Sequence, residues 1–413
     1  MKIKINNKEY ILIEQPVKHI LLQTKKELHG WYPGKRECTA ERLLINPYNG
    51  CGIGCFYCYA RALPGYFEIF HEQEIIFVAE DFDKTVAEQL DSLNVATCGY
   101  LSPVTDPFQP LNEKYHLSEK ITQVFMERNI PIEFITKAKV PDEVIRLIKQ
   151  QKHSFGQVSI LTVNEKLRKI FAPNGATVGE LFGNLERMAK ENIYTVCRID
   201  PIFPYLTDDQ KNLREIVERA KSSGARHIIA SILDLPIKIT DDILNKIKEY
   251  FGAGMKWDYR QLYTERIGYL NTKIGYRKKI FTFLRELCDK KGLTFALCME
   301  YELLQARGDR HEARAIKGLN SEFMSSTNCE GMDIPVYIRK NGKFQPATDC
   351  KGNCLNCFQA KCGILELALG KQKKDFGKLS PEEMKENWPD LPGFKLKDYR
   401  RWSKEIKAPT LRL

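Results

Sequence analysis

Long apolar segments are missing from this chain of 413 residues. No apolar run approaches the roughly 18 residues that a membrane-spanning helix needs. The first ten residues, Met1 to Tyr10, lack the apolar stretch of a secretory signal peptide. Internal repeats and low-complexity segments are also absent from the sequence. We therefore expect a cytoplasmic protein without a membrane segment, in which 43% hydrophobic residues build one large core or two smaller ones.

Cysteine and positive charge, in contrast, are plentiful. The chain has 13 cysteines, most of them in two closely spaced groups. Because a reducing cytoplasm does not keep disulfides, these groups indicate metal ligation. The formal net charge is +11, with an excess of Lys and Arg in residues 1–50 and 371–413. This excess is either a phosphate-facing surface or a lysine-rich face exposed to water, and composition does not choose between them.

The first cysteine group lies in the sequence Asn46-Pro-Tyr-Asn-Gly-Cys51-Gly-Ile-Gly-Cys55-Phe-Tyr-Cys58-Tyr-Ala-Arg61. Its three glycines let the backbone curl, so that the three thiolates can converge on one cluster. A cubane iron–sulfur cluster that stores or transfers electrons takes four cysteines. A loop with three therefore predicts a cluster whose remaining iron is open to a substrate or cofactor.

Zinc and a disulfide are the alternative interpretations of this loop. Structural zinc sites need four ligands, usually in two paired knuckles. The nearest further cysteines, Cys38 and Cys98, are poorly spaced for that arrangement. A disulfide is not expected in a reducing compartment, so the sequence favours the cluster.

Strand-like and helix-like segments alternate along the chain, a pattern typical of parallel α/β folds. We expect an α/β fold of the partial (β/α)6 barrel type, with six or seven such units from one sheet and the active site at the carboxyl ends of the strands. The expected strands are 42–46, 96–101, 132–136, 157–161, 194–199, 227–230 and 294–299, and the expected helices are 82–93, 118–128, 142–150, 178–191, 208–222, 241–251 and 276–291.

The three-cysteine loop, with Tyr57 before its third cysteine, resembles the cluster loop of the radical S-adenosylmethionine (SAM) superfamily. Further motifs resemble its spore photoproduct lyase-like branch, often labelled DNA repair photolyases: Thr105-Asp-Pro-Phe-Gln-Pro110, Thr136-Lys137, Val158-Ser-Ile-Leu-Thr162 and Arg198-Ile-Asp-Pro-Ile-Phe-Pro204. The resemblance covers roughly residues 40 to 300. It implies a 4Fe-4S cluster, SAM bound at the open iron, a 5′-deoxyadenosyl radical, and a reductant such as flavodoxin or ferredoxin.

The resemblance also implies residue roles. Cys51, Cys55 and Cys58 would hold the cluster, and Tyr57 would lie against the adenine of SAM. Among the cofactor-binding residues that it implies, Thr105 would contact SAM beside Asp106, Lys137 would meet its carboxylate, and Ser159 would lie at its ribose or methionine end. Structural roles without any contact to SAM remain as alternatives for several of these residues: Thr105-Asp106-Pro107 would form a turn, and Lys137 would be a surface lysine. Arg198, in an otherwise apolar strand, is either a ligand contact or half of an internal ion pair.

Some positions depart from this branch. Spore photoproduct lyase has a hydrogen-donor cysteine before its SAM-contacting serine, whereas Pro103 and Val104 stand here, and Cys98 would need a shifted register. Thymine-dimer reversal by the spore mechanism is therefore not expected. Ile53 and Ala172 replace the His and Glu that are frequent in the branch. Tyr59, after the third cluster cysteine, is a candidate for a radical relay or for packing under the cluster.

The second cysteine group is Cys350, Cys354, Cys357 and Cys362, with Cys329 upstream as an additional ligand or a bystander. Four thiols close a tetrahedral zinc site or saturate an auxiliary iron–sulfur cluster, and the tight spacing favours the auxiliary cluster. We expect an N-terminal extension at 1–40, the partial barrel at 41–302, a cysteine-rich metal module at 303–370 and a basic tail at 371–413. Aromatic residues in that tail would stack on bases or pin it to the barrel.

The sequence thus predicts a radical SAM enzyme. Family resemblance and positive charge favour a nucleic acid as its substrate, through repair or base modification. Two alternatives stay open: modification of a peptide or protein with the help of an auxiliary cluster, and a non-catalytic metal-binding nucleic-acid module.

Overall fold

The computed structural model describes residues 1–6, 8–16, 42–63, 66–91, 93, 95–303, 316–335 and 337–346. Within these residues, no helix is both long enough and apolar enough to cross a membrane. The second cysteine group at 350–362 and the basic tail fall outside the described residues.

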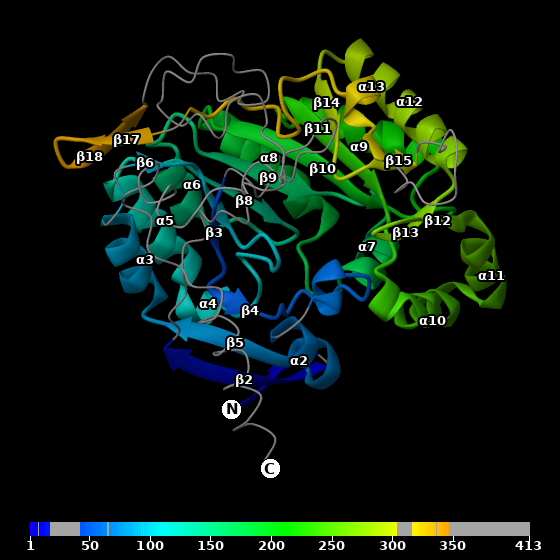
Figure 1. The fold of residues 1–413 in the computed structure, drawn as a ribbon, viewed down its shortest axis with the longest axis horizontal. Helices are drawn as coiled ribbons and strands as arrows, with labels where there is room; N and C mark the ends of the chain where they lie inside the picture. Colours follow the sequence, from blue (N-terminus) through cyan, green and yellow to red (C-terminus); the bar gives the residue numbers. More distant parts are fainter. Residues whose placement is uncertain are drawn as a thin grey trace, which may run out of the picture.

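A seven-stranded sheet forms the centre of the molecule (Figure 1). Adjacent strands within the sheet are all parallel. The spatial order of the strands, β14-β11-β10-β9-β8-β7-β3, is the reverse of their order in the chain. The expected α/β fold with a parallel sheet is confirmed. In the described part of the chain the barrel stays open, with β3 and β14 as its edges. The strands are β3 (Leu43–Ile45), β7 (Gly99–Leu101), β8 (Ile132–Thr136), β9 (Phe155–Ser159), β10 (Tyr194–Ile202), β11 (His227–Ile232) and β14 (Thr294–Leu297).

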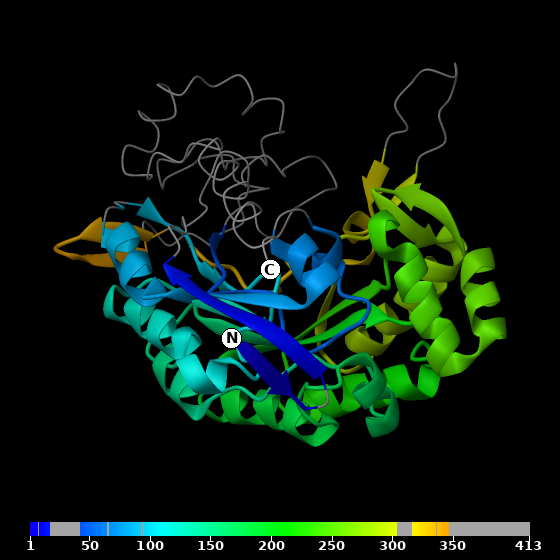
Figure 2. The same cartoon turned by 90° about the horizontal axis from the view of Figure 1, so that it is seen from below.

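Helices cover the convex face of this sheet (Figure 2). They are α3 (Phe82–Asp91), α5 (Leu117–Glu127), α6 (Asp142–Ile148), α8 (Val178–Lys190), α9 (Gln210–Ser222) and α12 (Ile274–Lys290). Two glycines mark where helices approach most closely: a Cβ at Gly99 would lie 2.5 Å from the Phe125 ring of α5, and one at Gly156 would lie 2.4 Å from the Met188 sulfur of α8. Any larger residue at these two positions would push the helix away from the sheet.

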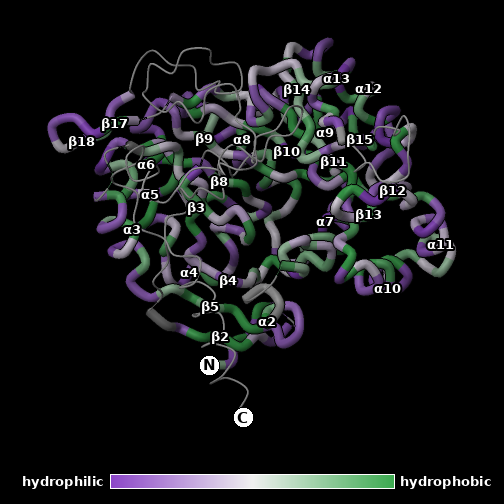
Figure 3. The backbone as a smooth tube through the Cα atoms, viewed as in Figure 1, coloured by the Kyte–Doolittle hydropathy of each residue, from purple (hydrophilic) through white to green (hydrophobic). Residues whose placement is uncertain are grey.

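The two faces of the sheet differ because side chains alternate along a strand. Residues such as Phe134, Val158 and Ile228 belong to the large core beneath the helices, and Figure 3 shows apolar residues along these strands. The alternate positions of β8, β9 and β10, namely Glu133, Gln157 and Arg198, are buried polar side chains on the opposite, inner face. The buried polar side chains of these three strands therefore lie together on the inner face, opposite the helices.

A second sheet packs beside the first strand. It has the order β1-β2-β5-β4, with β1 (Lys2–Ile5), β2 (Lys8–Pro16), β5 (Ile75–Glu80) and β4 (Tyr48–Asn49). Helix α2 (Tyr66–Gln73) precedes β5. The described part of the expected N-terminal extension is thus built into a sheet that also holds β4, immediately before the first cysteine group.

Smaller elements complete the described chain. They are α4 (Asn112–Tyr115), α7 (Glu165–Phe171), α10 (Thr240–Phe251), α11 (Ala253–Leu262), α13 (Asn320–Phe323), the short helices Tyr59–Ala62 and Ile237–Ile239, and the strands β6 (Val95–Ala96), β12 (Tyr263–Ile267), β13 (Tyr269–Thr272), β15 (Tyr301–Leu303), β16 (Ile316–Gly318), β17 (Tyr337–Lys340) and β18 (Lys343–Pro346).

A loop formed by residues 327–334, here called the floor loop, packs on the inner face at the amino ends of the strands. Ile334 lies in a buried cluster with Cys98, Phe155 and Ile229, which lie just before β7, at the start of β9 and in the first half of β11. Tyr194, the first residue of β10, donates its hydroxyl proton to the Gly331 carbonyl at 2.8 Å. The floor loop therefore closes one end of the inner face.

Candidate active site

The three-cysteine loop stands at the carboxyl end of β3, the first strand of the central sheet. Cys51, Cys55 and Cys58 are free thiols of intermediate exposure. Burial raises the pKa of Cys51 well above its usual range and that of Cys55 to about 11, while the nearby Lys137 ammonium acts to lower the latter. The thiols thus lie close enough to influence one another electrostatically, and Cys51 and Cys55 need a metal cation to become thiolates at neutral pH.

Two side chains fix the backbone of this loop. Gln109 accepts a hydrogen bond from the Gly52 amide at 2.7 Å and donates one to the Gly50 carbonyl at 3.2 Å. From another direction, Asn174 donates its side-chain amide to the Gly52 carbonyl at 2.8 Å, and its backbone amide to the Ile53 carbonyl at 3.1 Å. Sequence reasoning missed both residues, although Gln109 lies within the Thr105–Pro110 motif. These four hydrogen bonds tie the backbone at Gly50, Gly52 and Ile53 to two other segments of the chain.

The glycines of the loop have the conformational role that the sequence predicts. Gly50 and Gly54 have φ angles of +103° and +83°, which disfavour other residues. Gly52 is required for a different reason: a Cβ there would lie 2.7 Å from the Ile5 side chain of β1. The N-terminal strand thus packs directly against the loop.

The aromatic residues around the third cysteine have separate surroundings. Tyr57 is 6% exposed and meets Phe203 edge to face, with ring centroids 4.8 Å apart. Phe203 in turn stacks on Phe171 at 4.0 Å. Tyr59 is 44% exposed and donates its hydroxyl proton to the Pro103 carbonyl at 2.7 Å. The adenine contact of Tyr57 and the radical relay at Tyr59 stay predictions.

Asp106 is a buried anchor for the end of β8. Its carboxylate accepts hydrogen bonds from the Lys137 amide at 2.7 Å, the Thr136 hydroxyl at 2.8 Å and the Phe108 amide at 2.9 Å. Burial nevertheless raises the pKa of Asp106. Through these hydrogen bonds Asp106 positions the backbone of Lys137. A direct contact between Asp106 and SAM would have to use the lone pairs of the carboxylate oxygens that these three bonds leave free.

Lys137 and Ser159 end neighbouring strands on the inner face. The Lys137 ammonium lowers the pKa of Asp200 and acts in the same direction on Cys55, so this cation lies between the cysteine loop and the end of β10. Ser159, the last residue of β9, is 2% exposed. The expectation that these strand ends meet near the cysteines is consistent with this arrangement.

Arg198 forms the internal ion pair that was one of its two sequence interpretations. Its guanidinium pairs with Asp200, and another nitrogen donates to the Gln157 side-chain oxygen at 3.0 Å. Asp200 also accepts the Ser231 hydroxyl proton at 2.5 Å. Arg198 therefore positions Asp200, whether or not it also touches a ligand.

Several buried polar atoms beside the cysteine loop lack hydrogen-bond partners in the described part of the chain. They are the Asn46 side-chain oxygen and the hydroxyls of Ser102 and Thr105, at the ends of β3 and β7. Buried polar atoms without partners are rare in folded proteins. Together with three thiols that no fourth thiol is seen to join in the described ranges, they suit a polar cofactor on an iron–sulfur cluster.

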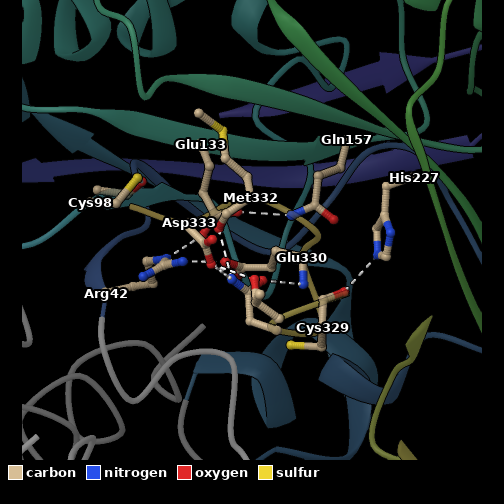
Figure 4. Close-up of polar contacts among 12 residues, drawn as sticks. Arg42, Cys98, Glu133, Gln157, His227, Cys329, Glu330, Met332 and Asp333 are labelled. Atoms are coloured by element: carbon tan, nitrogen blue, oxygen red, sulfur yellow. Dashed lines mark hydrogen bonds and ion pairs between the residues drawn. The ribbon is translucent and has the colours of Figure 1, made fainter. Parts of the chain in front are cut away.

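The described residues contain no group of three metal-ligating side chains that could hold a single metal ion. A cubane cluster does not require one, because it offers four irons to its cysteine ligands and spreads the thiolates apart. Cys329 lies in the floor loop, where its carbonyl oxygen meets the His227 ring at 3.0 Å (Figure 4). Its carbonyl thus lies beside the first residue of β11, whereas the first cysteine group follows the end of β3.

Comparison with known proteins finds a family match for the part of the chain that holds the cysteine loop. Residues 45–220, which include the three cysteines, Thr105, Lys137, Ser159 and Arg198, match the model of the radical SAM superfamily. These residues therefore form a radical SAM domain. The family predicted from the cysteine loop is thus confirmed, as is the expectation of an enzyme, and the family implies an iron–sulfur cluster and SAM.

Individual relatives of this radical SAM enzyme are distant. It is 25% identical over 392 residues to a protein named radical SAM Nα-GlyT isomerase from Pseudomonas phage M6, which covers 88% of this chain and 80% of that one. It is 23% identical to an uncharacterised protein from Methanocaldococcus jannaschii over 40% of this chain and 62% of the other. Its fold resembles that of a mutant of spore photoproduct lyase, with a TM-score of 0.50 and 12% identity over 70% of this chain and 82% of that chain.

Proposed function

We propose that this radical SAM enzyme modifies a nucleic acid by rearranging one of its bases, using a 4Fe-4S cluster held by Cys51, Cys55 and Cys58. When bound, the cluster and SAM supply one-electron cleavage to a 5′-deoxyadenosyl radical, with the electron coming from a flavodoxin or ferredoxin. The observation that carries the proposal is the loop of three thiols at a strand end, braced by Gln109 and Asn174 beside buried polar atoms without partners.

Residues of this chain would orient SAM. Lys137, anchored through its amide by Asp106, supplies a cation for the carboxylate of SAM. Ser159, Thr105 and Ser102 supply hydroxyls for its ribose or amino group. The packed rings of Tyr57, Phe203 and Phe171 give the loop a rigid apolar base that excludes water from the reacting atoms.

The choice of substrate and reaction rests on the relatives. The phage relative, which matches most of this chain, is named an isomerase, and an isomerisation returns the hydrogen atom that it removes. Spore photoproduct lyase, which shares the fold, is named for a photoproduct. The positive net charge of +11 also suits a phosphate backbone.

The test is anaerobic reconstitution with iron and sulfide, followed by dithionite and SAM. We expect four irons per loop cluster and release of 5′-deoxyadenosine. An intact cluster that releases none would instead favour a non-catalytic metal-binding module. For the substrate class, binding of DNA or RNA should weaken steeply as salt rises, whereas salt-insensitive turnover of a peptide would refute the nucleic-acid proposal.

A second metal site at Cys350, Cys354, Cys357 and Cys362, with Cys329 as a further candidate ligand, is part of the proposal. Iron, sulfide and zinc should be measured on the wild type and on a variant with Cys354→Ala and Cys357→Ala. Loss of iron and sulfide together is expected for an auxiliary cluster. Loss of one zinc without a change in iron would replace the cluster by a structural zinc site.

A further inference from the structure

The hairpin of β17 and β18 lies outside the candidate active site, and its two faces differ. Its cross-strand pairs are Tyr337 with Pro346, Ile338 with Gln345, Arg339 with Phe344 and Lys340 with Lys343. Because side chains alternate along a strand, Tyr337, Arg339 and Phe344 share one face. The opposite face, here called the lysine face, carries Ile338, Lys340, Lys343 and Gln345.

The face with Phe344 fixes the hairpin to the body of the molecule. The Phe344 side chain is fully buried, and Arg339 donates to the Leu90 carbonyl at 2.7 Å. The Tyr337 hydroxyl lies 2.6 Å from a ring nitrogen of His153. The lysine face therefore has a defined position and points away from these contacts.

These contacts place the hairpin at the amino ends of the central strands. β17 pairs with β6, which lies shortly before β7, and His153 lies shortly before β9. The cysteine loop instead follows the end of β3. Figure 1 shows the hairpin at the edge of the molecule, with its tip directed outward. A ligand on the lysine face would therefore bind outside the candidate active site.

Lys340 and Lys343 carry unpaired charges at the tip of the hairpin. Both side chains are exposed, and neither makes a hydrogen bond or an ion pair with any residue that the structure describes. Residues 337–346 also contain Arg339, but no Asp or Glu. The hairpin is thus a local excess of positive charge without carboxylates of its own.

The turn of the hairpin brings the two ammonium groups side by side. Asn341 and Gly342 have φ angles of +51° and +80°, which a two-residue type I′ turn requires. This turn places Lys340 directly opposite Lys343 on the same face. Like charges at directly opposite positions destabilise an antiparallel pair of strands. An anion bound between the two lysines would remove this repulsion.

Protection of an exposed edge strand is the alternative role for such lysines. A lysine on an edge strand discourages pairing with another chain. This role suits Lys343 on β18, the edge strand of its sheet, but not Lys340, because β17 lies between β18 and β6. The opposed pair of lysines therefore favours an anionic ligand.

We propose that the lysine face binds the phosphate backbone of the nucleic-acid substrate. This inference rests on the proposed function and adds a docking surface to it. Each ammonium would contact a phosphate oxygen, and a two-stranded ribbon fits a major groove about 12 Å wide. Contacts with phosphates do not read the sequence directly, so the hairpin would hold the nucleic acid while the candidate active site selects the base.

The test measures how the affinity for a fluorescein-labelled DNA duplex, and for an RNA duplex of the same sequence, depends on salt. Dissociation constants are measured by anaerobic fluorescence anisotropy between about 50 and 200 mM KCl, on enzyme reconstituted with cluster and SAM, without reductant. The double variant Lys340→Gln, Lys343→Gln should reduce the slope of log K against log [KCl] by about 1–2, since each phosphate contact contributes about 0.9. It should also weaken binding at least about tenfold at about 100 mM KCl.

The matched control is the double variant Lys279→Gln, Lys290→Gln on α12, which removes the same charge from two exposed positions on the convex face. This control should keep the wild-type slope. Lys340→Arg with Lys343→Arg preserves both charges and should keep it as well. Release of 5′-deoxyadenosine and the melting temperature should stay at wild-type values in all three variants, because the fold and the cluster are untouched.

A wild-type slope in Lys340→Gln, Lys343→Gln would overturn the inference while leaving the proposed function standing. A control on α12 that lost as much slope as the hairpin variant would also overturn it, because binding would then depend on net charge alone. Failure of the proposed function has a different signature: the wild type releases 5′-deoxyadenosine but binds neither duplex. In that case the nucleic-acid substrate is wrong, and the inference fails with it.

Discussion

The two ends of the inner face are built from similar residues in opposite ways. At the amino ends, Arg42, Glu133 and Glu330 form a buried ion cluster, and the floor loop adds bonds to His227 and Tyr194. At the carboxyl ends, the Asn46 side-chain oxygen and the hydroxyls of Ser102 and Thr105 lack hydrogen-bond partners among the described residues. Paired polar groups stabilise the fold, whereas unpaired ones indicate where a ligand belongs.

The largest expected effect separates activity from folding. Cys55→Ala removes one of three cluster ligands, so release of 5′-deoxyadenosine should fall below detection in a chromatographic assay. Cys288→Ala, at a buried thiol of α12 beneath the sheet, is the control and should keep this activity. Wild-type levels of product from Cys55→Ala would show that the loop does not hold the reactive cluster.

Arg42→Met should be the largest change at the amino end. It leaves Glu133 and Glu330 buried together without their shared cation. Removing one partner of a buried ion cluster costs about 3–5 kcal/mol, to be measured as the free energy of unfolding of the apoprotein in urea. Lys84→Met, which removes an exposed pair with Asp81, is the control and should cost less than about 1 kcal/mol. Equal effects of the two substitutions would contradict the structural role assigned to the floor.

Gly331→Ala tests how closely the floor loop fits. Its Cβ would lie 2.5 Å from the His227 ring and 2.7 Å from the Tyr194 hydroxyl oxygen, at a φ of +73°. Gly342 has a similar φ of +80°, but a Cβ added there would have no atom within 4 Å. Gly342→Ala therefore measures the backbone strain alone, about 1–2 kcal/mol. Gly331→Ala should lower the melting temperature further than Gly342→Ala does. Identical shifts would mean that the loop does not press against the sheet.

The smallest effect is a pH dependence of stability. Burial, together with the charge of Glu330, raises the pKa of Glu133 from 4.5 to about 8, against the opposing effect of Arg42. The folded state then binds more protons than the unfolded state between these values, so stability falls as pH rises from 5 to 8.

Glu133→Gln should flatten this decline by roughly 1–2 kcal/mol in urea unfolding at pH 5 and pH 8. Glu72→Gln, at an exposed carboxylate, should leave the wild-type slope unchanged. If the free energy of unfolding falls equally between pH 5 and pH 8 in Glu133→Gln and in the wild type, the protonation of the amino-end cluster has been assigned to the wrong group.

The sequence predicted the central sheet well because the spacing of apolar residues within each segment indicates whether that segment forms a strand or a helix. β8 agrees with its expected range at both ends, and β10 extends three residues beyond its expected end. The segment 96–101 divides instead: Val95–Ala96 pairs with β17 and only Gly99–Leu101 joins the sheet. The sheet of β1, β2, β5 and β4 was missed, because its pairing joins segments far apart in the chain.

The candidate site was predicted only in part for a related reason. Cysteine spacing is a local signal, so the cluster loop and its family were recognisable. Gln109 and Asn174 were missed since an amide side chain in a turn has no distinctive pattern before the fold brings it to the loop. The contact between Arg42 and Glu330 joins residues 288 positions apart, and no local rule of sequence predicts it.

The most direct test is the electron paramagnetic resonance spectrum of the reconstituted, dithionite-reduced protein with and without SAM. Addition of SAM should shift the signal of a 4Fe-4S cluster in the wild type, because one iron is open to the cofactor, and Cys55→Ala should give no such signal. A cluster signal that SAM leaves unchanged, or a protein that binds zinc in this loop in place of iron, would contradict the central claim.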